Sequence, residues 1–128
     1  PVVEAIEAAG LRGIEVWPVM LHKADRPSET LSQLVFAYEA GPGLAEEDKQ
    51  APEPCEVCGV TKYAYHKRGY MRVSRTALRQ SVDGQRTHEW FGSDTKTGHQ
   101  EILISNRFAR LIIENKWKGV GLKGVHLV

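Results

Sequence analysis

Two cysteines separated by two residues are the clearest chemical feature of this sequence. They lie in the run PCEVCG at positions 54–59. Two thiolates at this spacing can bind one metal ion from a tight turn, and the glycine after the second lets backbone amides point at the sulfurs. A tetrahedral zinc ion needs four ligands. We therefore predict a structural zinc site at Cys55 and Cys58, with His66 as the nearest candidate for a third ligand.

Other roles for the cysteine pair remain open at this point. A redox CxxC opens a helix after a strand, where the helix N-terminus lowers the thiol pKa. Prolines at 52 and 54 and the glycine at 59 argue against such a helix. The pair is also too close for the long-loop disulfides of small secreted domains. Reduced thiols left from an incomplete site are the remaining alternative. Further histidines that could join the site are His88, His99, His22 and His126.

A basic stretch from 62 to 86 follows the cysteines and suggests a second chemistry. It carries seven Lys and Arg side chains and three tyrosines, at 63, 65 and 70, against a single acid, Asp83. Cations can meet phosphates while tyrosines stack on bases, so a zinc-ribbon-like nucleic-acid-binding module is an alternative function. A solvated surface neutralised by the acidic segment before it is the simpler interpretation.

The composition is that of an ordinary soluble globular domain. Hydrophobic residues make up 41% and charged residues 26%, with a formal net charge of +1. We expect a single domain over 1–128. No apolar run approaches the ~20 residues that cross a bilayer, so we predict a cytoplasmic protein without a membrane partner. The phosphate-loop, dinucleotide, zinc-protease and serine-hydrolase motifs are missing from the sequence, and we predict that the chain is not an enzyme.

An internal repeat organises the two ends of the chain. Residues 2–16 align with residues 108–122, and Gly13 falls on Gly119. Both copies begin with apolar residues at helical spacing, which predicts a helix that ends at Gly10 or at Asn115 in a left-handed cap. A large apolar residue, the shared glycine and a short strand then follow, at 14–16 or 120–122. The predicted unit is therefore helix, turn, strand.

The second copy also indicates what precedes the helix. Residues 101–104 form a short strand-like run, and Ser105-Asn106 is a suitable N-cap for a helix from Arg107. The matching strand of the first copy would lie upstream of Pro1. We therefore expect the chain to be the C-terminal part of a longer protein, although a natural start at Pro1 is the alternative.

The segments between the copies complete the expected fold. We predict strands at 31–40 and 70–73, an exposed acidic loop at 43–54, and a short helix capped by Ser74 that runs to Arg79. Residues 83–99 are predicted to be a loop that packs Trp90 and Phe91 inward. The fold class is α+β: two helix-turn-strand units around a small mixed sheet, with the cysteine loop as a knuckle.

The PCEVCG run at 54–59, the segment 107–120 and its echo at 2–16 resemble the bacterial double-CXXCG motif family. Some relatives in that family are thought to be immunity proteins of polymorphic toxin systems. The resemblance implies a metal-stabilised, non-catalytic scaffold whose partner is a cognate protein toxin. It covers nearly the whole chain but only the C-terminal half of the family pattern, because the first CXXC has no counterpart here. The missing N-terminal half is therefore a second expected partner.

Overall fold

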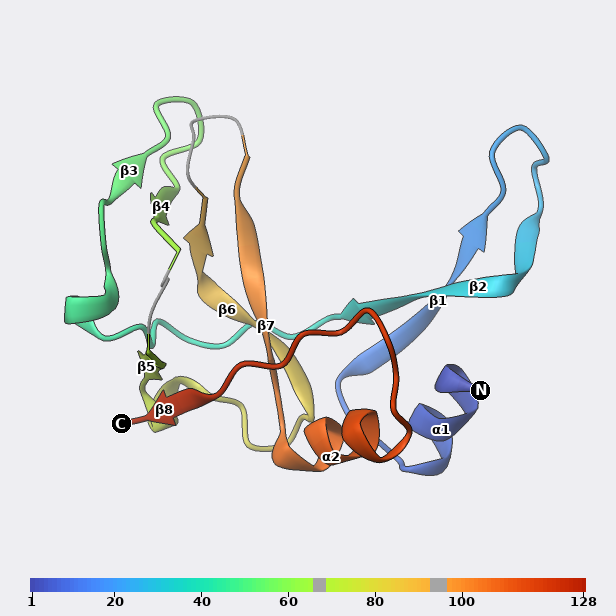
Figure 1. Ribbon diagram of the computed structural model, residues 1–128. Coiled ribbons are helices and arrows are strands. Elements are labelled where there is room, and N and C mark those ends of the chain that lie inside the picture. The colour runs from blue at the N-terminus through green and yellow to red at the C-terminus, as the bar shows by residue number, and fades with distance from the viewer. Residues whose placement is uncertain (66–68, 93–96) are drawn as a thin grey trace.

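The computed structural model describes residues 1–65, 69–92 and 97–128 and has a mixed α+β fold, as predicted (Figure 1). The described helices are α1 (Val2–Ala8) and α2 (Asn106–Glu114), with two short 3-10 helices at Glu46–Asp48 and Arg75–Ala77. Neither α1 nor α2, within these ranges, is long and apolar enough to cross a membrane.

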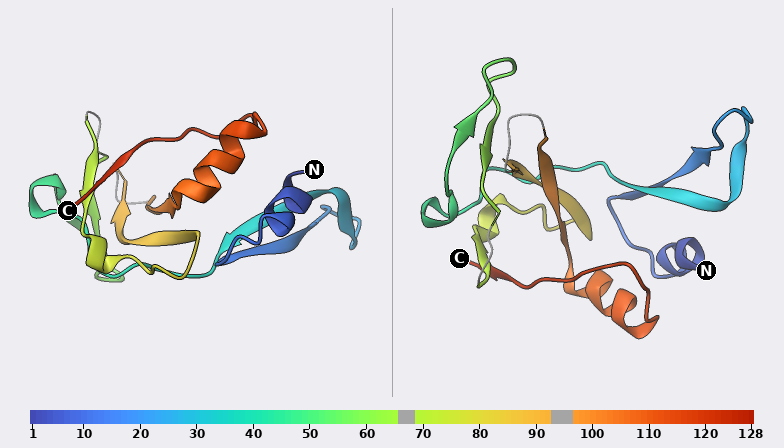
Figure 2. Two further views of the ribbon diagram at one scale, coloured as in Figure 1. Left: turned by 90° about the horizontal axis from the view of Figure 1, so that it is seen from below. Right: turned by 45° about the horizontal axis from the view of Figure 1, so that its top comes forward.

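A two-stranded hairpin, the arm, projects from the rest of the molecule (Figures 1 and 2). Its strands are β1 (Ile14–Met20) and β2 (Pro27–Phe36), paired antiparallel with Ile14 opposite Phe36. The base of the arm contributes Ile14, Leu34 and Phe36 to the core, whereas its outer half exposes Trp17 and Met20. Two-stranded hairpins are marginally stable in water, so the arm depends on the packing at its base.

The body contains a four-stranded sheet in the order β3-β4-β6-β7 and a two-stranded sheet of β5 and β8. The strands are β3 (Glu53–Pro54), β4 (Thr61–Tyr63), β5 (Met71–Val73), β6 (Gly84–Phe91), β7 (His99–Ile104) and β8 (Val125–Leu127). The β4/β6 and β5/β8 pairs are parallel, and β3/β4 and β6/β7 are antiparallel. Strand β7 is an edge of the larger sheet.

A small core lies where α1, α2 and the base of the arm meet. Ile6, Phe108 and Ile112 are buried together, and Leu11, Leu111 and Trp117 are partly buried against them, with residues of the arm and β7. After α2 the chain runs as an irregular segment, residues 117–124, to β8 (Figures 1 and 2). We call this segment the strap.

Both copies of the predicted repeat contain a helix followed by a turn, but only the first copy continues into a strand at the predicted position. Both predicted helices are present, and the Ser105 Oγ accepts a hydrogen bond from the Phe108 amide at 3.2 Å, as expected of an N-cap. The residue in the left-handed region after α2 is Lys116, with φ 53, and not Asn115. The strand predicted at 120–122 is absent from the described structure, because no neighbouring segment pairs with it.

Three predictions for the middle of the chain need correction. Residues 84–91 form strand β6, where a loop was expected, and only Phe91 of the aromatic pair is buried. The arm strand β2 is Pro27–Phe36, earlier than the predicted 31–40, because its pairing with β1 begins at Pro27. The segment at 43–54 is not an exposed loop, since Leu44 and Asp48 are buried. The predicted strand near 70–73 is confirmed as β5, and Ser74 precedes a 3-10 helix that ends at Ala77.

Candidate functional site

The two cysteines lie in the loop that joins β3 to β4. Pairing of Glu53 with Lys62 brings the ends of this loop together. Inside it, the Cys55 amide donates to the Val60 carbonyl and the Gly59 amide donates to the Cys55 carbonyl, each at 2.8 Å. Gly59 has φ +74, a left-handed conformation that glycine adopts without strain. The sequence thus closes a tight turn around the sulfurs.

Backbone amides in this turn favour the thiolate of Cys55. Hydrogen bonds from the amides of Cys58 and Val57 lower the pKa of the Cys55 thiol, and the Cys58 side chain adds to the effect. Cys55 is partly buried and Cys58 is exposed, and neither is in a disulfide. A pair of partly exposed cysteines with amides directed at one sulfur fits two positions of a tetrahedral zinc site.

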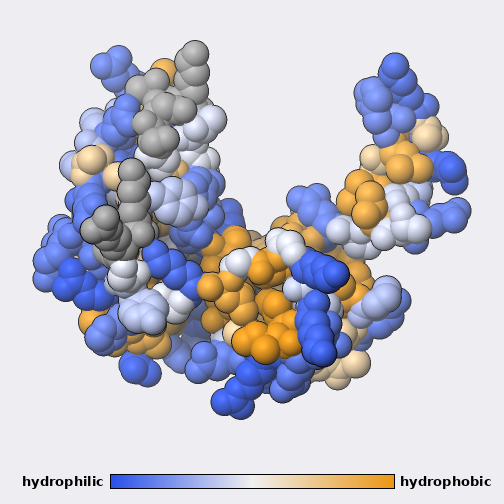
Figure 3. Space-filling model, viewed as in Figure 1, coloured by the Kyte–Doolittle hydropathy of each residue, from blue (hydrophilic) through white to orange (hydrophobic). Residues whose placement is uncertain are grey.

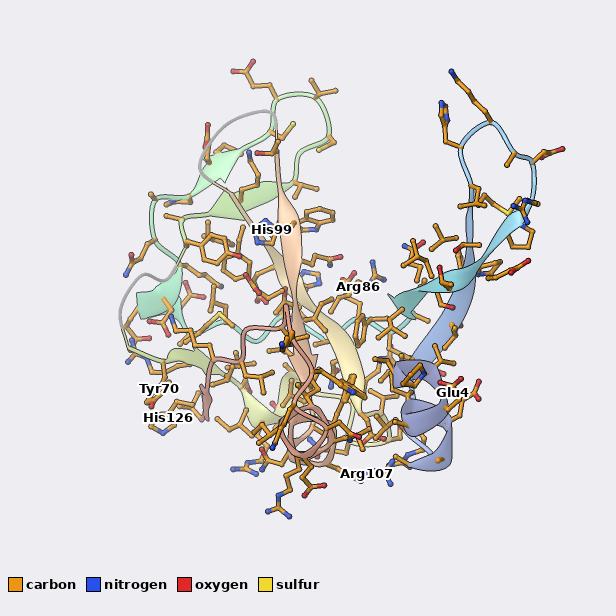
Figure 4. All side chains as sticks on the ribbon, turned by 45° about the vertical axis from the view of Figure 1, so that its right-hand side comes forward. Glu4, Tyr70, Arg86, His99, Arg107 and His126 are labelled. Atoms are coloured by element: carbon orange, nitrogen blue, oxygen red, sulfur yellow. The ribbon has the colours of Figure 1, made fainter. Side chains whose placement is uncertain are left out.

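The other expected ligands do not join the cysteines in the part of the chain that is described. His66 lies outside the described residues. His88 contacts Glu39 at 3.1 Å and His99 contacts the Tyr65 hydroxyl at 2.7 Å. His126 is on β8 near Tyr70, at the opposite end of the body from His99 (Figure 4). Within the described ranges, no three His, Cys, Asp or Glu side chains gather as a metal-binding group. Zinc binding by the cysteine pair therefore stays a prediction.

Several described cations of the basic stretch contact groups of the protein itself. Arg72 binds the buried carboxylate of Asp48 through its Nη2 at 3.0 Å and its Nε at 3.2 Å. Lys62 is buried and donates to the Thr97 carbonyl at 2.9 Å. Arg79 stacks over the Tyr38 ring, with its guanidinium carbon 5.5 Å from the ring centre. These cations hold the body together, which leaves less charge available for phosphates than the sequence indicates.

An apolar groove of ≈590 Å³ could bind a partner. One wall is β7 with α2, and the opposite wall is the strap. Figure 3 shows apolar side chains gathered in the hollow between the body and the arm. The groove is lined mainly by apolar side chains from these elements and from β2, among them Leu34, Phe36, Ile102, Leu103, Ile104, Ile112, Trp117, Val120 and Leu122.

One end of the groove carries a polar cluster. Tyr65 and Glu101 line it, and the Nε2 atom of His99 lies 2.7 Å from the Tyr65 hydroxyl and 3.3 Å from Glu101 Oε1. The hydrogen bond to Glu101, with partial burial, raises the pKa of Tyr65 to about 12. The Tyr65 and His99 rings are 5.1 Å apart. The cluster therefore keeps a neutral phenol beside Glu101 at the rim of an apolar surface.

The total accessible surface is larger than that of a compact protein of this mass. It amounts to 9167 Å². A compact folded monomer of 14.3 kDa exposes about 6,800 Å². The excess, about 2,400 Å², includes half-exposed apolar side chains on both walls of the groove, such as Ile102 and Leu122, and on the arm. Contiguous exposed apolar patches on soluble proteins mark interaction sites.

Sequence reasoning found the cysteine loop but missed the groove. The available signal was the apolar content of the segment after α2, where Trp117, Val120 and Leu122 were assigned to a repeat unit. Comparison of the chain with models of protein families, with curated proteins and with solved structures found no match. The resemblance to the double-CXXCG motif family therefore stays a prediction.

Proposed function

We propose that this chain is a non-catalytic binding protein whose apolar groove holds a protein partner, and that it acts as an immunity protein against a cognate bacterial toxin. The observation that carries the proposal is the apolar groove itself, whose walls leave side chains such as Ile102 and Leu122 half-exposed. Stable protein interfaces bury about 800 Å² on each partner, and obligate ones bury more. A protein partner is large enough to cover this surface.

The cysteine loop has a structural role in this proposal. Zinc held by Cys55 and Cys58, completed by His66 or by ligands from a partner, would brace the β3–β4 end of the body. The amides directed at Cys55 support thiolate ligation. Cys55→Ser is then expected to release the ion and lower the melting temperature, because metal binding is coupled to folding. Elemental analysis and melting with and without chelator measure both effects. A metal-free native protein whose melting ignores chelator would contradict this role.

Binding to the toxin encoded beside this chain's gene tests the proposal. We expect the two proteins to co-purify and the chain to protect cells that express the toxin. Ile102→Asp, in the groove, should weaken the complex by at least about tenfold, because it places a charge in a desolvated apolar contact. Ile113→Asp is the matched control, since Ile113 is 63% exposed on α2 and does not line the groove. Equal weakening by both variants, or no complex at all, would reject the proposal.

The nucleic-acid alternative draws less support from the same structure. Arg72 pairs with Asp48 and Arg79 stacks on Tyr38. Two of the arginines expected to contact phosphates therefore already have partners within the protein. Salt-dependent binding to single or double strands that is lost in Arg75→Ala, an exposed site, would favour it again.

A further inference from the structure

Strand β7 has one side without a partner in the described structure. It is the edge of the sheet, and only β6 pairs with it. The Ser105 amide donates to the Asp83 carbonyl on the β6 side, and the Glu101 amide donates to the Thr87 hydroxyl on the same side. Backbone groups alternate along an antiparallel strand, so those of Ile102 and Ile104 point away from β6. In the described part of the chain neither residue makes a backbone hydrogen bond on that outer side.

This open edge lies along the apolar groove. Residues 101–104 all line the groove, so both faces of the strand and its edge border the same space. The strap lines it from the other side, and its residues 118–124 belong to no strand or helix. Two extended backbones thus border one apolar space. Unpaired strand edges are templates for another strand.

The size and charge of the groove favour a polypeptide over a small molecule. A ligand that fills ≈590 Å³ would leave most of the excess surface uncovered. It would also leave the outward backbone groups of Ile102 and Ile104 without matching partners. The charged side chains that line the groove are Lys118 and Lys123 on the strap side and Glu101 at one end. Lys118, which is exposed on the strap, favours an acidic side chain in the occupant.

We propose that β7 and the strap form the docking site for an extended strand of the partner protein, with apolar side chains at alternate positions and acidic side chains between them. The incoming strand pairs with the outer edge of β7, and its apolar side chains fill the groove against Trp117 and Leu122. This inference rests on the proposed function and names the mode in which the partner is held.

The test uses the full chain and a soluble synthetic peptide of alternating valine and glutamate, with a valine and lysine peptide as control. Amide hydrogen exchange, followed by NMR, measures the protection of the backbone amides on the outer edge of β7. We expect saturating acidic peptide to slow exchange at Ile102 and Ile104 by roughly tenfold, because hydrogen-bonded amides exchange only when they open. Leu103, whose amide faces β6, should change little. In a Trp17→Phe, Trp90→Phe variant, Trp117 fluorescence should shift to the blue.

An edge variant removes the donor without changing the charge. Ile102→Pro deletes an outward amide at a position where an edge strand tolerates proline, whereas Ile102→Val keeps that amide. Peptide affinity should fall about tenfold in the first and change little in the second, since one backbone hydrogen bond to the strand is lost. If Ile102→Pro does not fold, the exchange measurement on the unmodified chain decides alone.

Absence of slowing at Ile102 and Ile104, or equal slowing by the lysine peptide, would overturn the proposal. Slowing that appears without peptide and grows with chain concentration would mean that a second copy fills the groove, and would also overturn it. A toxin complex in which these two amides stay exposed would leave the immunity function standing and reject only the strand addition. Loss of toxin binding together with absence of slowing would reject both.

Discussion

The two helices end in the same turn, yet the chain behaves differently after each one. Following α1, the Leu11 amide donates to the Ile6 carbonyl at 3.4 Å and the Gly10 amide to the Glu7 carbonyl at 2.9 Å. Following α2, the Trp117 amide donates to the Ile112 carbonyl at 3.2 Å and the Lys116 amide to the Ile113 carbonyl at 3.1 Å. Both are Schellman caps with the expected apolar contact, since Leu11 and Trp117 pack on the same core.

The difference lies in the partner that each following segment finds. Residues 14–20 become β1 because β2 returns beside them. The equivalent residues after α2 are 120–126. Of these, 120–124 have no described segment to pair with and belong to the strap, whereas Val125 and His126 pair with β5. Local sequence is sufficient for a helix and its cap, whereas a strand exists only with a neighbour. This contrast is why the strap and β7 together can accept a strand from another molecule.

Asp83 joins the two units, and its removal should have the largest effect. It is 5% exposed and accepts hydrogen bonds from the Arg12 amide at 2.9 Å, the Ser105 hydroxyl at 2.8 Å and Arg107 at 2.9 Å. Arg107 also donates to the Gly10 carbonyl; Figure 4 labels it on α2. Asp83→Ala should cost roughly 3–5 kcal/mol of unfolding free energy, because it leaves the charged and polar partners of Asp83 without a hydrogen-bond acceptor.

Urea unfolding of Asp83→Ala measures this loss. Glu7→Ala, at an exposed acidic position on α1, is the control and should change stability by no more than about 0.5 kcal/mol. If the two variants unfold at similar urea concentrations, Asp83 does not couple the two helix ends.

The next largest effect should come from the equivalent isoleucines of the two helices. Ile6 and Ile112 are 3% and 7% exposed in one cluster. Truncation to alanine should cost about 2–4 kcal/mol at each site through lost burial and a residual cavity. Ile6→Ala should be the more costly, because Ile112 borders the groove and its cavity opens to solvent. Thermal melts of both variants check the order, and a reversed order would mean that the groove is closed in solution.

Most of the helical part of the fold could be predicted from the sequence, but β6 could not. In β6 the buried positions alternate as a strand requires, yet they are occupied by Gln85, Thr87 and Glu89 as well as Phe91. Distant groups satisfy them: Gln85 bonds with Arg79, Thr87 with the Glu101 amide, and Glu89 with the amides of Gly43 and Leu44. A period of apolar residues cannot reveal a strand whose buried face is polar.

The candidate site divides in the same way. The CxxC spacing and its glycine predicted the tight turn, because both are properties of a few adjacent residues. The groove depends on β7, α2 and the strap meeting in space, and nothing in the spacing of Ile102 and Leu122 indicates that they share one surface. The groove is formed by segments that are far apart in the sequence, so local residue spacing does not predict it.

The pH dependence of stability should report the Asp83 junction with a smaller effect. Burial raises the pKa of Asp83, but hydrogen bonds from the Arg12 amide, Ser105 and Arg107 lower it more, so the pKa lies below its ordinary value. Its stabilisation is therefore complete above the unfolded pKa, about 3.9, and is lost as the pH falls through the lower folded value. Between about pH 5 and 2, Asp83→Asn should lose less stability than the unmodified chain. If the variant and the unmodified chain lose the same stability on acidification, the Asp83 carboxylate is not the source of the loss.

The smallest and sharpest test exchanges the two caps. Gly10 and Lys116 hold the same left-handed position, with φ 61 and 53, but only Gly10 adopts it without strain. Gly10→Ala should destabilise by about 1 kcal/mol, and strain alone is responsible, because nothing lies within 4 Å of the added methyl group. Lys116→Gly should stabilise by about 0.5 kcal/mol, since the relieved strain exceeds the added entropy of the unfolded chain. Gly121→Ala, with equal space and no positive φ, should not destabilise. Changes of the same sign in the first two variants would show that the two turns are not equivalent.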